Sequence, residues 1–170
     1  MVLVKKKIIY SKCKNISLVL SDVDGVLTDG GMYYSKNGEY LKKFNTKDGM
    51  AVELLKKLFI PTIFVTKENS EISKQRAKKL KVKIFSNVKN KELLLDKILN
   101  KYDLKKNQIA YIGDDVNDLK IIKHVGFSAA PFDSNKIILK NVDYVCKNLG
   151  GMGAFREFSD LIIQSKSNYT

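Results

Sequence analysis

Carboxylates gather in two short stretches of the sequence, each directly after an apolar run. Asp22 and Asp24 follow the run SLVLS, and Asp114 follows QIAYIG. Ionised carboxylates at the end of a buried strand cost desolvation free energy unless a cation meets them. A hard cation that prefers oxygen ligands, above all Mg²⁺, would supply the missing positive charge. We therefore expect these acids, together with Asp115 and Asp118 just beyond Asp114, to converge around a magnesium ion.

A hydroxyl group and an ammonium group follow two further apolar runs. Thr66 ends the run IPTIFVT, and Lys91 begins a helical pattern after KVKIFSN. A hydroxyl can bind a phosphoryl oxygen, and an ammonium can offset phosphate charge. Together with the metal and its carboxylates, these groups indicate phosphoryl transfer. Asp115 and Asp118 are expected behind the metal ligands or at a helix N-terminus, where the helix dipole stabilises them.

The elements that must position these groups alternate between short β-branched apolar runs and helical patterns. This alternation predicts an α/β fold of Rossmann-like type, with a mostly parallel sheet and helices on both faces. Side chains that follow the strands then meet at the carboxyl edge of the sheet. The predicted strands span residues 16–22, 60–66, 81–87, 108–115, 125–130 and 142–146. The predicted helices span residues 48–58, 69–80, 90–102, 115–123, 134–140 and 153–165.

One segment interrupts this alternation. Residues 31–44 contain Asn37-Gly38, a strong signal for a type I′ β-hairpin because both central residues of that turn need positive φ. The hairpin follows the Asp22 loop directly, so we expect a flap over the carboxylates and no separate cap domain. The length of 170 residues suits a single domain. We place this domain at residues 1–170, with a tail at about 149–163 that also closes the site.

The net charge is +13, from 31 basic and 18 acidic residues. A nucleic-acid-binding surface would cluster its cations and interleave them with aromatic side chains. The lysines here are spread along most predicted helices and loops instead. We therefore expect a solvated lysine surface, no nucleic-acid partner, and an anionic substrate.

No apolar run approaches the roughly 20 residues that cross a bilayer. The first residues, MVLVKKKIIYSKCKN, lack the long apolar core of a signal peptide. These features predict a cytoplasmic protein with no membrane partner. Cys13 and Cys146 show neither metal-ligand nor redox spacing, so both are expected to be reduced thiols.

The chemical signals, in their order along the chain, resemble the haloacid dehalogenase-like phosphatases. They stand here as Asp22-Val-Asp24-Gly-Val26, Thr66, Lys91 and Gly113-Asp114-Asp115-Val-Asn-Asp118. The resemblance, over about residues 15–163, implies that Asp22 attacks phosphorus to form an aspartyl-phosphate. Asp24 would then protonate the leaving oxygen and later activate water. The resemblance also implies that Asp22, the backbone carbonyl of Asp24, and Asp114 hold Mg²⁺.

Within that family, four stretches are similar to the capless phosphatases of 2-keto-3-deoxy sugar acid phosphates. They are DVDGVLTDGGMYY, KKFNTKDGMAV, AYIGDDVND and GGMGAFREF. Members of this group hydrolyse 3-deoxy-D-manno-octulosonate 8-phosphate or sialic-acid-type nonulosonate 9-phosphates. They form tetramers in which each hairpin helps to enclose a neighbour's substrate. The resemblance therefore implies a homotetramer that acts on a phosphorylated sugar acid.

The second motif bears on the choice between these two substrates. Glu68 stands two positions after Thr66, and Lys79 lies in the following predicted helix. In the group that the chain resembles, a Glu/Lys pair is associated with the nine-carbon substrate, so the pair favours nonulosonate 9-phosphate. Lys67 is a departure, because the family usually has glycine after the threonine. This change is expected to alter how the substrate is oriented.

Other polar residues have a local role and a binding role open to them. Arg76 and Arg156 are the two arginines, and because a guanidinium binds a carboxylate through two parallel hydrogen bonds, we predict that they hold the sugar-acid carboxylate. Thr46 is either a substrate-binding residue or the N-cap of the helix near residue 48, with Asp48 as its first-turn acid. His124 is expected to be exposed or to cap a helix rather than to catalyse.

Two other classes of function are compatible with these residues. A noncatalytic phosphatase-like module bound to a nucleotide-sugar synthetase would keep the fold without the chemistry, although the intact acidic set argues against it. A nucleic-acid-binding protein would bind oligonucleotides in a salt-dependent way. Mg²⁺-dependent hydrolysis of an aryl phosphate, lost in Asp22→Asn, would distinguish the enzyme from both.

Overall fold

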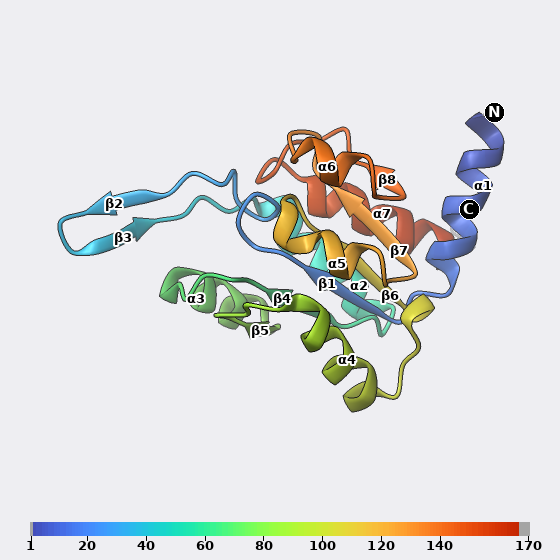
Figure 1. The fold of residues 1–170 in the computed structure, drawn as a ribbon, viewed down its shortest axis with the longest axis horizontal. Helices are drawn as coiled ribbons and strands as arrows, with labels where there is room; N and C mark the ends of the chain where they lie inside the picture. Colours follow the sequence, from blue (N-terminus) through green and yellow to red (C-terminus); the bar gives the residue numbers. More distant parts are fainter. Residues whose placement is uncertain (1, 167–170) are drawn as a thin grey trace.

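Six parallel strands form the central sheet, in the order β5-β4-β1-β6-β7-β8 (Figure 1). They are β1 (Leu18–Ser21), β4 (Thr62–Val65), β5 (Lys83–Phe85), β6 (Ile109–Ile112), β7 (Phe127–Ala130) and β8 (Tyr144–Val145). This computed structural model describes residues 2–166, with side chains from residue 7 onward, so the predicted domain limits at 1 and 170 lie outside it. The predicted α/β fold with a mostly parallel sheet is confirmed.

The central strands carry the predicted site residues to one edge of the sheet. β1 lies between β4 and β6 and pairs in parallel with both. All residues of these three strands are buried, as expected for parallel strands covered on both faces. The loops that leave their carboxyl ends begin at Asp22, Thr66 and Gly113, so the acidic motifs and the threonine meet at the same edge.

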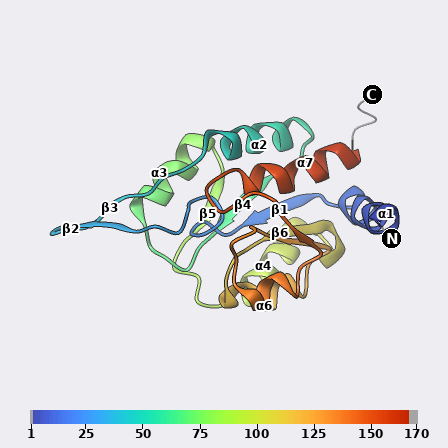
Figure 2. The same cartoon turned by 90° about the horizontal axis from the view of Figure 1, so that it is seen from above.

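Helices cover both faces of this sheet (Figure 2). One face carries α2 (Thr46–Lys57), α3 (Glu71–Leu80) and α7 (Ala154–Lys166), and the other carries α4 (Lys91–Tyr102) and α6 (Lys136–Leu139). The short helix α5 (Leu119–Ile122) packs into the same core as α4 and α6. Each face has its own hydrophobic core. In the first core, the rings of Phe127 and Phe158 stack with centroids 5.3 Å apart. The predicted helix at 115–123 is shorter, because a 3-10 turn (Val116–Asp118) precedes α5.

An N-terminal helix, α1 (Val2–Lys14), was not predicted. It packs against α7, where Cys13 is fully buried and Lys12 pairs with Asp143 at 2.5 Å. The run of three lysines at 5–7 interrupts the apolar pattern that would indicate a helix. The helix is therefore defined by contacts with the rest of the chain rather than by its own periodicity.

The predicted flap is a two-stranded hairpin, β2 (Tyr33–Ser35) and β3 (Gly38–Leu41), that projects from the body of the molecule (Figure 1). Its turn differs from the predicted one. Ser35 pairs with Gly38, which leaves Lys36 and Asn37 as the central residues. Positive φ falls on Gly38 (106°) rather than on both predicted central residues, so a type I′ turn at Asn37-Gly38 was the wrong prediction.

Two further expectations concern thiols and membranes. Cys13 and Cys146 are both free and buried, and burial raises the pKa of Cys13 to about 12. Neither is therefore a reactive thiolate near neutral pH.

Among residues 2–166, no helix combines the length and the apolar character needed to span a membrane.

Candidate active site

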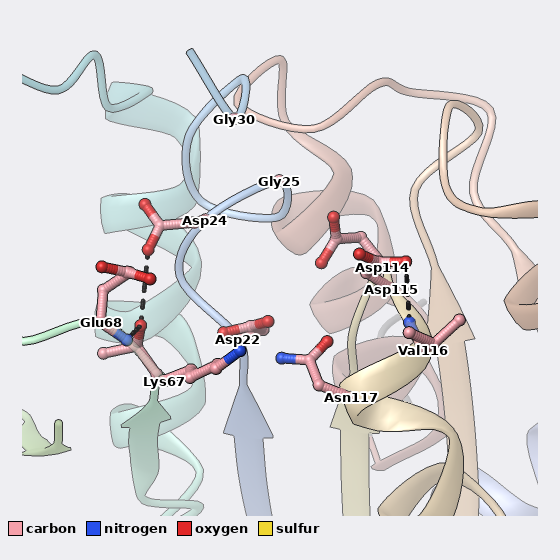
Figure 3. Close-up of a pocket in the computed structure, with 11 residues that line it drawn as sticks. Asp22, Asp24, Gly25, Gly30, Lys67, Glu68, Asp114, Asp115, Val116 and Asn117 are labelled. Carbon is pink, nitrogen blue, oxygen red and sulfur yellow. Dashed lines mark hydrogen bonds between the residues drawn. The ribbon is translucent and has the colours of Figure 1, made fainter. Parts of the chain in front are cut away.

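A cavity of about 320 Å³ opens at the carboxyl edge of the sheet (Figure 3). The loops after β1, β4 and β6 form its walls, so residues far apart in sequence face one space. The predicted site residues in its lining are Asp22, Asp24, Thr66, Glu68, Asp114 and Asp115. The lining also contains Gly25, Gly30, Lys67, Val116 and Asn117.

Asp22 follows β1 directly and is only 5% exposed. The backbone N–H of Val23 donates to its Oδ1 at 2.7 Å, and the Lys91 ammonium lies 2.9 Å from its Oδ2. These partners hold the carboxylate in one orientation. Burial and, next, the Asp118 carboxylate raise the pKa of Asp22 well above its ordinary value, against the opposing effect of Lys91. A further cation near Asp22 would therefore favour its ionised form.

Lys91 begins α4 behind the cavity and is buried. Its Nζ lies 2.5 Å from Asp118 Oδ1 and donates to the Tyr111 hydroxyl at 3.1 Å. Tyr111 in turn donates to the same Asp118 oxygen at 2.6 Å. Burial alone lowers the pKa of Lys91, but the attraction of Asp22 and Asp118 outweighs burial and raises it. A charged Lys91 thus lies beside Asp22, in a network whose Tyr111 the sequence analysis did not identify.

Carboxylate oxygens of Asp22, Asp114 and Asp118 lie within 4.8 Å of one another. Asp118 is already engaged, because its Oδ1 faces Lys91 and its Oδ2 accepts the Asp114 N–H at 3.0 Å. Asp22 and Asp114 are the members of this cluster that also line the cavity. Burial and then Asp118 raise the pKa of Asp114 to about 7. Three clustered carboxylates beside one buried ammonium fit a divalent, oxygen-binding cation.

Two glycines give these carboxylates the space they occupy. Gly25 has φ of 82°, and a Cβ at this position would collide with the Asp114 carboxylate. A Cβ at Gly113 would collide with the Asp118 carboxylate. Both glycines therefore make room for the carboxylates, and Gly25 is also favoured by its positive φ.

Asp24 has a different partner at each oxygen. The ammonium of Lys42 lies 2.5 Å from Oδ1, and the Thr66 hydroxyl donates to Oδ2 at 3.4 Å, the contact drawn as a dashed line beside Asp24 in Figure 3. Lys42 follows β3 at the base of the hairpin. Lys42 was not predicted as a site residue, because nothing in its spacing distinguishes it from the other lysines of the chain.

Lys67, which replaces the usual glycine, lines the cavity together with Glu68 and Asn117. Its side chain extends toward Asp22 (Figure 3). Lys67 is the lining residue with a cationic side chain, and the ion pairs among the described residues do not include it. Its charge is therefore available to an anion that enters the cavity. Asn117 was also missed, since an asparagine between Val116 and Asp118 carries no signal of its own.

Two of the predicted substrate-binding residues lie outside the lining on α2 and α3. Thr46 is the first residue of α2, and the helix is capped by Asn45, whose side chain accepts from the Lys47 N–H at 2.9 Å. The alternative of Thr46 as N-cap was therefore wrong. Lys79 is exposed in the last turn of α3, so the structure separates it from Glu68, which lines the cavity.

The two arginines also lie outside the lining. Arg76 donates to the backbone oxygen of Asn45 at 3.2 Å and lies over the Phe44 ring. The Arg156 Nε is 2.8 Å from Asp160 on the same helix. Within one copy of the chain, neither guanidinium is part of the lining of the cavity that contains Asp22 and Asp114.

The predicted C-terminal tail packs on the loop that follows β1. The Gly151 N–H donates to the Val26 carbonyl at 2.9 Å, and α7 begins at Ala154. Asp48 lies in the first turn of α2, as predicted, where it is buried and accepts the Arg156 N–H at 2.8 Å. His124 lies at the end of α5, with Nδ1 2.8 Å from the Lys120 carbonyl oxygen. The tail therefore supports the loop after β1 from outside the cavity.

Comparison with known proteins places this geometry in a family. Residues 52–150 match the model of the haloacid dehalogenase-like hydrolases. The 3-deoxy-D-manno-octulosonate 8-phosphate phosphatase of Haemophilus influenzae is 38% identical over 156 residues, which are 91% of this chain and 87% of that protein. The chain belongs to the haloacid dehalogenase-like hydrolase family. Membership confirms the predicted resemblance and shows that the protein is an enzyme.

Solved structures of family members agree with this assignment. The Moraxella catarrhalis 3-deoxy-D-manno-octulosonate 8-phosphate phosphatase, in complex with magnesium, phosphate and the KDO molecule, is 33% identical with a TM-score of 0.91 and covers 95% of this chain and 93% of that one. The cobalt-bound Haemophilus influenzae enzyme is 36% identical with a TM-score of 0.88, covering 91% of each chain. The metals in these relatives support a divalent metal in the family fold that this chain shares.

Proposed function

We propose that this phosphatase hydrolyses 3-deoxy-D-manno-octulosonate 8-phosphate with Mg²⁺ and through an aspartyl-phosphate. The observation that carries the proposal is the placement of Asp22 and Asp24 in one cavity with Thr66 and Asp114, with Lys91 2.9 Å behind Asp22. Nucleophile, acid, hydroxyl and charge-offsetting groups are thereby within reach of one phosphoryl group.

In the first half-reaction, a carboxylate oxygen of Asp22 attacks phosphorus. The new bond joins this oxygen to phosphorus, the bond between phosphorus and the sugar oxygen breaks, and Asp24 gives its proton to the departing oxygen. Thr66, which contacts Asp24 and lines the cavity, is placed to donate a hydrogen bond to the phosphoryl group.

In the second half-reaction, the aspartyl-phosphate is hydrolysed. Asp24, now ionised, accepts a proton from water as the water oxygen bonds to phosphorus. The bond between phosphorus and the Asp22 oxygen breaks, which restores the Asp22 carboxylate and releases inorganic phosphate. Lys91 keeps a positive charge beside Asp22 throughout, because Asp118 and Tyr111 hold it in place.

The carboxylates of Asp22 and Asp114 and the backbone carbonyl of Asp24 would hold Mg²⁺. When bound, the metal offsets the negative charge of the carboxylates and of the substrate phosphate. We assign Asp118 a positioning role instead, because its oxygens already accept from Lys91 and from the Asp114 N–H. Asp115 accepts from the Val116 N–H at 2.8 Å and caps the turn that presents Asp118.

We assign the eight-carbon substrate rather than the nine-carbon one for two reasons. The relatives described above are named for octulosonate 8-phosphate. The Glu68/Lys79 pair that favoured nonulosonate 9-phosphate is divided in the structure, with Glu68 in the cavity and Lys79 on the outer turn of α3. Glu68 remains the observation that supports the nine-carbon substrate as a second candidate.

The active unit that we propose is a homotetramer. The cavity of one chain is open, and Arg76 and Arg156 face away from it. The predicted clamp on the sugar-acid carboxylate therefore requires a neighbouring copy to complete the site. The hairpin and the 149–163 tail are the segments that we expect to take part in this closure.

The decisive experiment measures phosphate release from octulosonate 8-phosphate, nonulosonate 9-phosphate and para-nitrophenyl phosphate, with and without Mg²⁺. We expect the largest kcat/KM for octulosonate 8-phosphate and no turnover without a divalent metal. A larger kcat/KM for nonulosonate 9-phosphate would move the assignment to the second candidate. Absence of hydrolysis with all three substrates would favour the noncatalytic module instead.

A further inference from the structure

Lys42 connects the hairpin to the catalytic acid, and we propose that it is a positioning residue for general acid catalysis by Asp24. It holds Asp24 Oδ1, so that the proton for the leaving oxygen is carried by Oδ2, on the side that faces Thr66. This inference rests on the proposed function and adds a role for the hairpin within a single copy of the chain.

The first support is the burial of Lys42. Its side chain is 0% exposed, although it belongs to a segment that is otherwise largely in contact with solvent. A buried ammonium is costly unless it is paired. Lys42 has two carboxylate partners, Asp24 Oδ1 at 2.5 Å and Glu39 Oε1 at 3.1 Å. The position of this lysine is therefore closely determined.

The second support is the anchor behind Lys42. Glu39 receives a hydrogen bond through its other oxygen from the Ser70 hydroxyl. Ser70 is the N-cap of α3, and its side chain accepts from the Ser73 N–H at 3.3 Å. A continuous series of polar contacts thus runs from the start of α3 through Glu39 to Lys42 and Asp24. The hairpin base cannot move without disturbing the acid.

The third support is the division of labour at Asp24. Oδ1 is occupied by the Lys42 ammonium, which holds it in place through a charge-assisted hydrogen bond. Oδ2 has a hydroxyl at 3.4 Å instead, and Asp24 and Thr66 both line the cavity. Lys42 therefore selects the oxygen that acts as acid and fixes its direction toward the substrate.

A lysine that merely anchors the hairpin would predict a different pattern of losses. Weaker folding lowers the rate on every substrate by the same factor. Loss of acid positioning lowers the rate most where the leaving oxygen needs protonation, as in a sugar or alkyl phosphate. Para-nitrophenyl phosphate needs little protonation, because nitrophenolate is a stable anion. The ratio of the two losses therefore separates positioning from anchoring.

The experiment compares kcat for octulosonate 8-phosphate and para-nitrophenyl phosphate in Lys42→Met and Lys42→Gln. Lys43→Met is the matched control, since Lys43 is exposed and its nearest acid, Asp29, is 4.0 Å away. We expect Lys42→Met to lose about 10²-fold on the sugar phosphate and less than about 5-fold on the aryl phosphate. Lys42→Gln, which keeps a donor in the pocket, tests the same ratio if Lys42→Met does not fold.

A double variant completes the test. Once Asp24→Asn has removed the acid, adding Lys42→Met should cost less than about 3-fold more on the sugar phosphate, because no proton donor remains to be positioned. Equal losses on both substrates in the folded variants, or additive losses in the double variant, would overturn the positioning role while leaving the proposed function intact. A wild-type chain inactive on both substrates would overturn both.

Discussion

The floor of the cavity and the hairpin above it are built in opposite ways. β1, β4 and β6 are buried along their whole length, whereas all three residues of β2 are exposed. In the hairpin, Tyr34 is 66% exposed and Tyr40 is 73% exposed. Asp22 and Lys91 are thus placed by two hydrophobic cores, while the hairpin is held mainly by polar contacts at its base.

This difference indicates that the cavity floor and the hairpin contribute to the enzyme in different ways. A floor fixed by core packing can hold carboxylates close together at the cost of their desolvation. An isolated two-stranded ribbon has little stability of its own, so its outer half needs another surface or remains solvated. We therefore expect changes in the floor to affect chemistry and folding, and changes in the outer hairpin to affect association.

The largest expected effect is that of Asp22→Asn on turnover. The substitution removes the nucleophile with almost no change in shape, so kcat should fall by at least about 10³-fold. The midpoint of thermal unfolding should stay the same or rise, because a buried charge is removed. Rates on an aryl phosphate and a thermal melt test both expectations, and a variant that keeps a substantial part of the wild-type rate would contradict the aspartyl-phosphate route.

Lys91→Met should damage both the chemistry and the fold of the floor. Without its ammonium, Asp22 and Asp118 remain buried with no cation between them. Removing one partner of such a group costs about 3–5 kcal/mol of unfolding free energy. Urea denaturation measures this loss, and Lys97→Met, at an exposed position of the same helix, is the matched control. Similar unfolding free energies for the two variants would mean that the network does not stabilise the floor.

Asp48 tests the buried body away from the catalytic floor. Burial raises the pKa of Asp48 to about 6, so between about pH 4 and 6 the unfolded chain loses this proton before the folded chain does. Stability therefore falls as pH rises through this window, by up to about 3 kcal/mol.

Asp48→Asn keeps the acceptor for the Arg156 N–H but cannot ionise. The difference in unfolding free energy between this variant and the wild type, in metal-free buffer, should grow in favour of the variant from pH 4 to pH 6 and stay constant above it. A difference that does not vary with pH would show that Asp48 ionises normally in the folded chain.

The smallest expected effect on folding is that of Tyr34→Ser combined with Tyr40→Ser in the outer hairpin. Both side chains are largely exposed, so the unfolding free energy of a single copy should change by less than about 0.5 kcal/mol. The proposed tetramer of this variant should nevertheless dissociate at a higher protein concentration than the wild-type tetramer does, as measured by light scattering. Tyr102→Ser on α4 is the control, and an unchanged assembly in the hairpin variant would remove these tyrosines from the interface.

Much of this molecule was determined by the sequence alone. Short, continuous apolar runs separated by helical patterns predicted the parallel sheet, and the residues that end those runs predicted a common edge. Asp22, Asp24, Thr66 and Asp114 do share one cavity. The physical reason is local: strand burial and the direction of parallel strands place whatever follows them.

Only the tertiary structure decided that Lys42 faces this site and that the arginines do not. Lys91 was predicted from its place at the start of a helix, and it does lie beside Asp22. Lys42 is indistinguishable from the other lysines by composition or spacing, yet it pairs with Asp24. Arg76 and Arg156 carry the charge expected of a carboxylate clamp but are directed elsewhere. Long flexible side chains find their partners through desolvation and packing among distant elements, and these depend on the assembled fold rather than on sequence period.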